Sequence, residues 1–418
     1  MNPILRFKLS FMMFLQFFIW GVWWVPLAVY MGTDRIGMEA IIFLAYLSQP
    51  IAAMISPFFL GLIADRYFPS QKVLAVLHAL GAVMLLAVPF FGEMGDAGRT
   101  GFITLIILHM LCYMPTIGLT NTIAFKTMED PEKHFPTIRV WGTIGWIVSG
   151  LVVGILLNQF MASTAEETAW PFYLAAGAAL VLAVFSLRLP HTPPPSKGNK
   201  ATTAEILGLD AVRRLSSRSF WTFIIASVLL CIPLAAYYSF AALYASHAGV
   251  ENLAAWMSTG QMSEVLFMLL MPLAFRKLGV KWMLIIGMLA WVLRYALFAL
   301  GAPDQIFWMI FMGILLHGVC YDFFFVTGMV YVEKKAPAAI RAQAQGFLVQ
   351  MTLGVGMFIG MLVSGWLFNQ LVGGTTGAER MAQYRMFWAI PAGFAFVVMV
   401  FFALLFKDTT KPPSRNQD

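Results

Sequence analysis

Residues 41–91 read IIFLAYLSQPIAAMISPFFLGLIADRYFPSQKVLAVLHALGAVMLLAVPFF, two apolar runs around a short loop that carries all of the formal charge. Each run is about as long as a helix needs to cross a hydrocarbon core, roughly 20 residues. The runs show no alternation with period two, which membrane strands would require. A helix also satisfies its own backbone hydrogen bonds in lipid. The segment therefore predicts two membrane-spanning helices joined by a charged turn.

The same pattern recurs along the whole chain of 418 residues, of which 60% are hydrophobic and 11% charged. Soluble domains carry about 45–50% apolar and about 25% charged residues. The composition thus excludes a soluble enzyme, a nucleic-acid-binding protein and a disordered chain. We expect an all-α membrane protein with twelve transmembrane helices. The predicted spans are 9–30, 41–63, 73–91, 102–125, 138–160, 170–187, 220–244, 254–275, 282–300, 306–331, 345–371 and 384–406.

The basic residues indicate how these spans are oriented. Twenty-one of the 27 Lys and Arg residues lie in the two tails and in the loops on the same side as the tails. The opposite loops hold four, and Arg139 and Arg294 fall in or beside spans. Cytoplasmic loops are enriched in Lys and Arg. The formal net charge of +7 therefore reflects topology, not a nucleic-acid partner, and both termini are expected in the cytoplasm.

A polar segment divides the chain into two parts with six predicted spans each. Residues 190–219 include HTPPPSKGNK at 191–200, and we expect this segment to be a cytoplasmic linker. The expected domains are an N-terminal six-helix bundle at 1–189 and a C-terminal six-helix bundle at 220–418. The loops at 61–72 and 272–281 occupy corresponding places in the two parts, which favours an internal repeat.

Two acidic residues, Glu264 and Asp322, are enclosed by apolar sequence inside predicted spans. An ionised carboxylate in mid-membrane costs at least roughly 2.5–3.5 kcal/mol, so each must have a partner, face water or bind a proton. A proton-coupled transporter could use any of these states, and we expect the two acids to line a water-filled cavity. The alternative is a structural ion pair with Arg139 or Arg294.

Polar and aromatic residues cluster near these acids at helical spacing. Gln261 and Glu264 are three residues apart and share a helix face. Such groups fit a flat heterocycle, which stacks on rings while amides and carboxylates bond its edge. The aromatic residues alone also suit ordinary packing in a membrane span. The other candidates are Arg139, Thr143 and Trp146 at i, i+4 and i+7, His317 and Tyr321 beside Asp322, and Tyr238 after Pro233.

No catalytic or metal-binding set is expected. Cys112, Cys231 and Cys320 all lie in apolar runs, where cysteine behaves as a small core residue. His317 and Asp322 have no nucleophile at a matched spacing. We therefore predict no enzyme activity and no cofactor other than the proton as coupling ion.

The loop Gly61-Leu-Ile-Ala-Asp65-Arg66, followed by Lys72, resembles the signature that the major facilitator superfamily carries between its second and third helices. This resemblance implies two six-helix bundles with a central cavity and alternating access. It also implies a gating role for Asp65 and Arg66.

Further matches run from the first predicted span past the tenth, in order, and resemble the nucleoside–proton symporter family of that superfamily. They are Phe14-Leu-Gln16-Phe-Phe-Ile-Trp20-Gly, Tyr113-Met-Pro-Thr-Ile-Gly-Leu-Thr-Asn121, Phe135-Pro-Thr-Ile-Arg139-Val-Trp-Gly-Thr143, Gln261-Met-Ser-Glu264 and Tyr321-Asp322-Phe-Phe. The resemblance implies substrate contacts for Arg139, Thr143, Gln261 and Glu264, and proton coupling for Glu264 and Asp322. Trp146 replaces a phenylalanine of the family pattern. His317 replaces a tyrosine, Tyr321 a phenylalanine, and Ala235 and Tyr238 two amides.

Together these observations predict proton-coupled import of nucleosides across a bacterial inner membrane by a monomer in the lipid bilayer. The missing amides leave a proton symporter of a sugar or another small polar metabolite as the alternative. A drug–proton antiporter is disfavoured because the fifth span lacks a Gly-Pro interruption. A ligand sensor is disfavoured because no long cytoplasmic loop is present.

Overall fold

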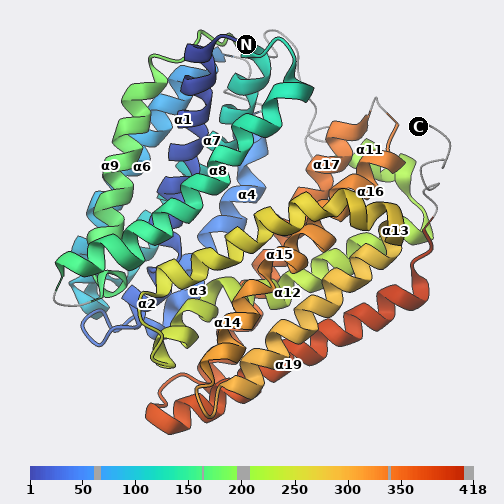
Figure 1. Ribbon diagram of the computed structural model, residues 1–418. Helices are drawn as coiled ribbons and strands as arrows, with labels where there is room; N and C mark the ends of the chain where they lie inside the picture. The colour runs from blue at the N-terminus through green and yellow to red at the C-terminus, as the bar shows by residue number, and fades with distance from the viewer. Residues whose placement is uncertain (61–66, 162–163, 195–207, 338–339, 409–418) are drawn as a thin grey trace. The chain divides into compact units, whose positions relative to one another are not determined.

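The computed structural model describes residues 1–60, 67–161, 164–194, 208–337 and 340–408, and every regular element in these ranges is helical (Figure 1). Ten helices are long and apolar enough to cross a membrane. They are Pro3–Gly32, Glu39–Phe59, Ser70–Gly92, Gly95–Thr127, Lys133–Phe160, Arg218–His247, Leu253–Gly301, Phe307–Lys335, Arg341–Leu371 and Gly377–Leu405. The predicted all-helical membrane fold is confirmed.

The chain forms two compact units. The first comprises Met1–Thr202 with Glu251–Ser258. Within it, α1 packs against α8 and α9, and α6 packs against α7 and α9. Its elements are α1 (Pro3–Trp24), α2 (Leu27–Gly32), η1 (Glu39–Ile41), α3 (Ile42–Tyr46), α4 (Ser48–Phe59), α6 (Ser70–Gly92), η3 (Gly95–Gly98), α7 (Arg99–Thr127), α8 (Pro131–Leu151), η4 (Val152–Leu156), η5 (Leu157–Phe160), η6 (Ala165–Glu167) and α9 (Trp170–Ser186).

The second unit comprises Thr203–Val250 with Thr259–Asp418. Its long helix α12 packs against α18 and α19. The elements are α11 (Leu209–Leu215), α12 (Arg218–His247), α13 (Leu253–Gly301) from Thr259 onward, α14 (Phe307–Leu315), α15 (His317–Cys320), the π-helix η7 (Tyr321–Val326), α16 (Thr327–Lys335), α17 (Arg341–Val349), the π-helix η9 (Gln350–Gly356), α18 (Met357–Leu371) and α19 (Gly377–Leu405). The helix α11 falls inside the predicted linker.

Two places in the structure bear on the predicted number of spans. The expected break between spans 254–275 and 282–300 is present, because α13 consists of two helices that meet at a kink at Gly279, with φ 69° and ψ 177°. Glycine has no Cβ and adopts positive φ readily. The helix α9 has 17 residues, whereas the shortest of the ten long helices has 21. The count of twelve spans therefore stays a prediction.

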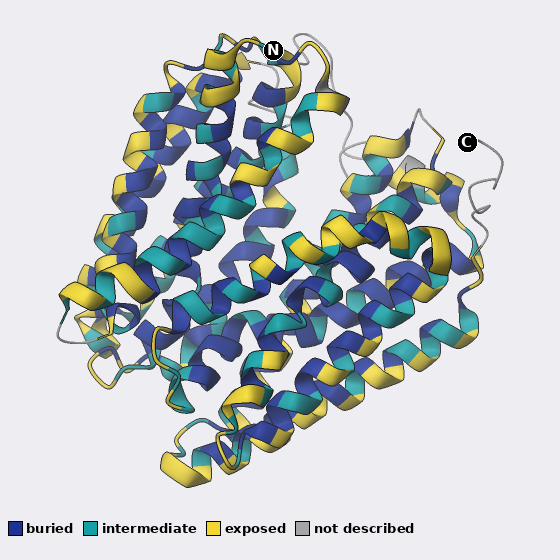
Figure 2. Cartoon of the chain, in the orientation of Figure 1, coloured by how far each residue is buried: buried dark blue, intermediate teal, exposed yellow. Residues whose placement is uncertain are grey.

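Close helix contacts in the first unit depend on glycines of α8. A Cβ on Gly145 would collide with the carbonyl oxygen of Phe14 in α1, and one on Gly142 would lie 2.6 Å from the Phe17 ring. Small residues let helix backbones approach closely in membranes. Figure 2 shows buried and exposed residues alternating along single helices. Among the exposed apolar side chains are Leu269 at 73% and Leu404 at 75% exposure, as expected for surfaces that lie against lipid.

The three cysteines are free thiols, as their apolar surroundings predict. Cys231 and Cys320 are buried, and Cys112 is half-buried. Within the described ranges, no group of three or more metal-ligating side chains comes together. The proposed gating residues Asp65 and Arg66 lie outside the described residues.

Candidate substrate and proton-coupling site

The first unit presents one set of predicted site residues on α8. Asp130 caps this helix, because its side chain accepts a hydrogen bond from the Lys133 amide at 3.1 Å. The helix places Arg139, Thr143 and Trp146 on one face, and all three are half-buried. A half-buried guanidinium, hydroxyl and indole can together bond and stack on a polar, flat ligand.

Residues of α1 hold this face in place. The Arg139 guanidinium lies over the Phe17 ring, 4.1 Å from its centroid. The Trp146 ring meets the Trp20 ring edge-on, with centroids 5.5 Å apart. Trp20 also packs against Tyr113 of α7. The sequence singled out the three α8 residues but did not reveal this aromatic support.

Behind Trp20 lies a buried polar network that sequence reasoning missed. The Gln16 amide donates to Thr116 Oγ1 at 2.7 Å, and its carbonyl oxygen accepts from His78 Nε2 at 2.9 Å. The Tyr113 hydroxyl donates to the Gln16 backbone carbonyl. Gln16, His78 and Thr116 are each at most 2% exposed. The available signal in the sequence was His78, a histidine within an otherwise apolar span. Its position in the sequence does not indicate which residue it bonds.

The second unit presents the other predicted residues on α12, α13, α15 and η7. Gln261 and Glu264 of α13 are half-buried. Glu264 Oε2 lies 3.9 Å from His317 Nε2, and the two side chains are 15% and 5% exposed. The His317 ring stacks between Tyr237, at 5.8 Å, and Tyr321, at 6.0 Å. Glu264, His317 and Tyr321 therefore form one cluster, as the sequence predicted.

The surroundings of Asp322 differ from those that we expected. It lies in the π-helix η7, is completely buried, and neither carboxylate oxygen has a hydrogen-bond partner. We expected it to line a water-filled cavity, or else to be paired with an arginine. In this conformation it does neither, although Glu264 lies close enough to act on it electrostatically. The extra residue of a π-turn rotates the side chains that follow it, and the sequence alone did not predict this turn.

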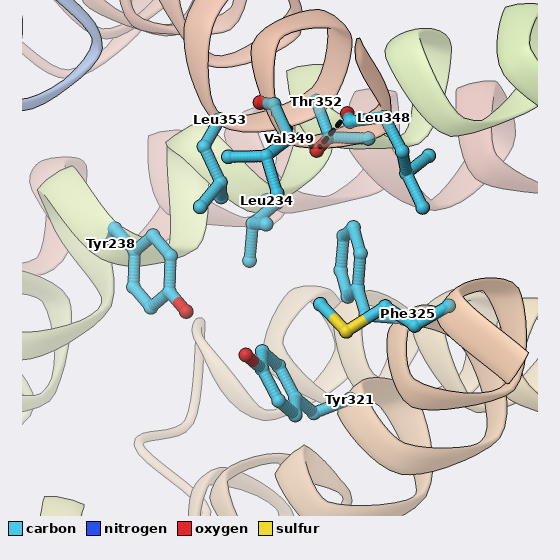
Figure 3. Close-up of a pocket in the computed structure, with 9 residues that line it drawn as sticks. Leu234, Tyr238, Tyr321, Phe325, Leu348, Val349, Thr352 and Leu353 are labelled. Atoms are coloured by element: carbon cyan, nitrogen blue, oxygen red, sulfur yellow. Dashed lines mark hydrogen bonds between the residues drawn. The ribbon is translucent and has the colours of Figure 1, made fainter. Parts of the chain in front are cut away.

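A small pocket opens beside this cluster within the second unit (Figure 3), with a cavity volume of about 40 Å³. The hydroxyls of Tyr238 and Tyr321 point toward one another across it. The remaining wall is mostly apolar, and Thr352 turns its hydroxyl back to the Leu348 carbonyl at 2.8 Å. The pocket therefore combines two phenol hydroxyls with apolar walls, the kind of lining that small-molecule sites share.

Comparisons with known proteins agree with this architecture. A profile described as "Nucleoside H+ symporter" matches residues 3–411. The chain belongs to the nucleoside H+ symporter family. It is therefore a transporter and not an enzyme, as its sequence predicted.

Relatives match over nearly the full chain. The putative nucleoside transporter YegT of Escherichia coli is 39% identical over 96% of this chain and 94% of its own length. The nucleoside permease NupG of E. coli is 32% identical over 96% of both chains. The crystal structure of NupG has a TM-score of 0.82 and covers 98% of this chain and all of that one. These matches confirm the predicted family and the major facilitator fold.

Proposed function

We propose that this chain imports nucleosides together with protons by alternating access. The observation that carries the proposal is the cluster of Glu264, His317 and Tyr321 beside the pocket, because a titratable carboxylate there adjoins rings on which a base can stack. The family assignment supports the same substrate class.

Each unit contributes residues that bind the substrate. In the first unit, Arg139 and Thr143 bond polar groups of the nucleoside, and Trp146 stacks on the base. In the second unit, Gln261 and Glu264 bond polar edges, and His317, Tyr238 and Tyr321 surround the aromatic part. Roles of this kind combine a few placed polar groups with apolar and aromatic walls, as in other ligand sites.

Glu264 and Asp322 are the proposed proton-coupling residues. Protonation removes a charge that would be costly to enclose as the site closes. Asp322 already lies without a hydrogen-bond donor, so its neutral form suits the environment seen here. Release of the proton follows when the carboxyl meets water on the other side. The membrane potential adds roughly 2.3 kcal/mol per charge per 100 mV.

The same proposal includes the finer architecture. We place twelve spans in two six-helix bundles at 1–189 and 220–418, joined by a linker at 190–219, in a monomer within a bacterial inner membrane. Both termini lie in the cytoplasm, supported by the distribution of Lys and Arg. Asp65 and Arg66 serve gating, and the proton is the coupling ion with no other cofactor.

Replacement of the Glu264 carboxyl tests the coupling. Glu264→Gln keeps the shape of the side chain but cannot exchange a proton, so uridine accumulation driven by a proton gradient is expected to disappear in proteoliposomes. Glu379→Gln, at an exposed carboxylate of α19, serves as the control and should leave accumulation unchanged. Normal accumulation by Glu264→Gln would refute the assignment.

A sugar symporter is the alternative, because Ala235 and Tyr238 occupy positions where amides were expected. Competition separates the two functions. Excess unlabelled adenosine should block uptake of labelled uridine, whereas excess ribose or maltose should not. Inhibition by the free sugar alone would favour the alternative.

A further inference from the structure

The second unit contains a break in its helical backbone directly before His317. The helix α14 ends at Leu315, Leu316 has ψ −4°, and α15 begins at His317. In a regular α-helix each amide donates to the carbonyl four residues earlier. The Gly318 amide instead donates to Ser263 Oγ in α13, at 3.0 Å. This segment therefore relies on another helix for hydrogen bonds that it does not make itself.

Arg294 of α13 donates hydrogen bonds to the carbonyls on the other side of the break. Its Nε donates to the Gly313 carbonyl at 2.8 Å, and its Nη2 lies 3.5 Å from the Ile314 carbonyl. In an unbroken helix these carbonyls would accept from the amides of residues 317 and 318. Arg294 is completely buried, and its guanidinium lies 4.0 Å over the Tyr237 ring. A planar guanidinium can bond two neighbouring carbonyls at once, which an ammonium cannot do in the same way.

Ser263 connects the two sides of the break. Besides accepting from Gly318, its hydroxyl lies 2.7 Å from the carbonyls of Leu315 and Gly260, either of which can accept its proton. The backbones are in close contact, since a Cβ on Gly318 would lie 2.5 Å from the Ser263 carbonyl carbon. A Cβ on Gly260 would lie 3.1 Å from the His317 Cβ. The position of His317 is thus determined from α13.

We propose that Arg294 and Ser263 are positioning residues for transport, which hold the break between α14 and α15 and so direct His317 toward Glu264. A regular helix through residues 313–318 would give the two carbonyls back their own amides and rotate His317 and the residues after it. The buried Arg294 cation therefore serves the backbone and is not a partner for Asp322, whose oxygens accept no hydrogen bond. The proposal rests on the role given above to His317 and Glu264.

The test removes the acceptor for the Gly318 amide without changing charge. Ser263→Ala is expected to raise the KM for uridine in proteoliposome counterflow about tenfold, because the buried Gly318 amide is left without an acceptor. Vmax should stay within about twofold of the wild-type value. Ser227→Ala is the matched control. Ser227 is also buried, but its hydroxyl only bonds the Phe223 carbonyl of its own helix, so its KM should not change. Ser263→Cys retains a weaker acceptor and should give an intermediate KM.

A double-mutant cycle separates positioning from general structural damage. If Ser263 acts through His317, Ser263→Ala should change KM by no more than about twofold in the His317→Ala background, because the two effects are not additive. Arg294→Lys should show the same dependence on His317, since lysine cannot bond both carbonyls. If the KM changes of Ser263→Ala and His317→Ala multiply fully in the double variant, the proposal is overturned. An unchanged KM in Ser263→Ala would overturn it as well.

The cycle also distinguishes this proposal from the proposed function. If His317→Ala raises KM while Ser263→Ala and Arg294→Lys do not, positioning is wrong and the substrate role of His317 remains. If His317→Ala itself leaves KM unchanged, the substrate role of His317 is wrong and the positioning proposal fails with it. Thermal unfolding of each purified variant identifies any that are misfolded. If Arg294→Lys does not fold, the Ser263 variants decide the outcome.

Discussion

Trp146 illustrates how a single residue of the site depends on its neighbours. Its spacing from Arg139 and Thr143 predicted a shared helix face, and α8 provides it. The edge-on contact with Trp20 then sets the plane of the indole. Edge-to-face aromatic pairs contribute about 0.5–1.5 kcal/mol beyond the area that they bury. The indole is therefore held in one orientation before any substrate arrives.

Truncation of this indole should weaken substrate binding. Trp146→Ala is expected to raise the KM for uridine about tenfold, whereas Trp146→Phe should change it only about twofold because a ring remains. Trp141→Ala, on the same helix but 40% exposed, is the control and should behave as wild type. Counterflow kinetics in liposomes measure all three. Equal KM values for the Ala and Phe variants would contradict stacking on the base.

The residue types of the site could be predicted from the sequence, but their surroundings could not. Glu264, His317 and Tyr321 were expected to lie together. In the structure Glu264 lies 3.9 Å from His317, and the His317 ring stacks on the Tyr321 ring. The burial of Asp322 was not expected, since a π-turn leaves no periodic signal in an apolar run. The bonds of Gln16 to Thr116 and His78 were not foreseen either, because they join residues 100 and 62 positions apart.

At the level of elements, the contact between α1 and α8 depends on the absence of side chains. The Cβ of any other residue at Gly145 would occupy the place of the Phe14 carbonyl oxygen. Spaced glycines in a membrane helix permit close packing of this kind. The structure adds which helix approaches and which backbone atom would be displaced.

A pair of glycine variants tests this contact. Gly145→Ala should lower the Tm of the purified protein by about 5 °C, because overpacking costs about 1–3 kcal/mol. Gly177→Ala is the control, because a Cβ at that position of α9 meets nothing within 4 Å, and its Tm should stay within about 2 °C of wild type. Thermal unfolding in detergent measures both. An unchanged Tm in Gly145→Ala would show that the two helices separate at little cost.

Helix positions could be predicted well, and helix interruptions poorly. Apolar length identifies a span, because lipid thickness sets how many residues are needed. It also placed a break between residues 275 and 282, where Gly279 divides α13, but it does not show that α14 and α15 are separate. That separation depends on contacts between segments distant in the sequence, such as those of Arg294 with Gly313 and Ile314.

At the level of the whole molecule, charge distribution predicts the topology. The loops on the proposed outer side carry only Arg35, Arg99, Arg380 and Arg385. Arg35 bonds Glu93 at 2.9 Å and Arg99 bonds Asp96 at 2.6 Å, so both have acidic partners in that region. Acidic residues contribute little to the positive-inside signal, so the small number of outer basic residues is what favours the proposed orientation.

Reporter fusions test this orientation. A fluorescent protein that folds only in the cytoplasm should be bright when fused after residue 418, and alkaline phosphatase there should be inactive. Alkaline phosphatase fused after Gly95, the first residue of η3 after α6, should be active instead. The reverse pattern would invert the topology, and activity of alkaline phosphatase at both positions would refute an even number of spans.

The burial of Cys231 and Cys320, which are 0% and 1% exposed, has a practical consequence for spectroscopy. A water-soluble maleimide reacts with thiolates that it can reach, so these two thiols should stay unlabelled in the folded protein. Only the half-buried Cys112 needs replacement before a single reporter cysteine is introduced at a chosen surface position. After that one replacement, probes attached to introduced cysteines can report distances during turnover.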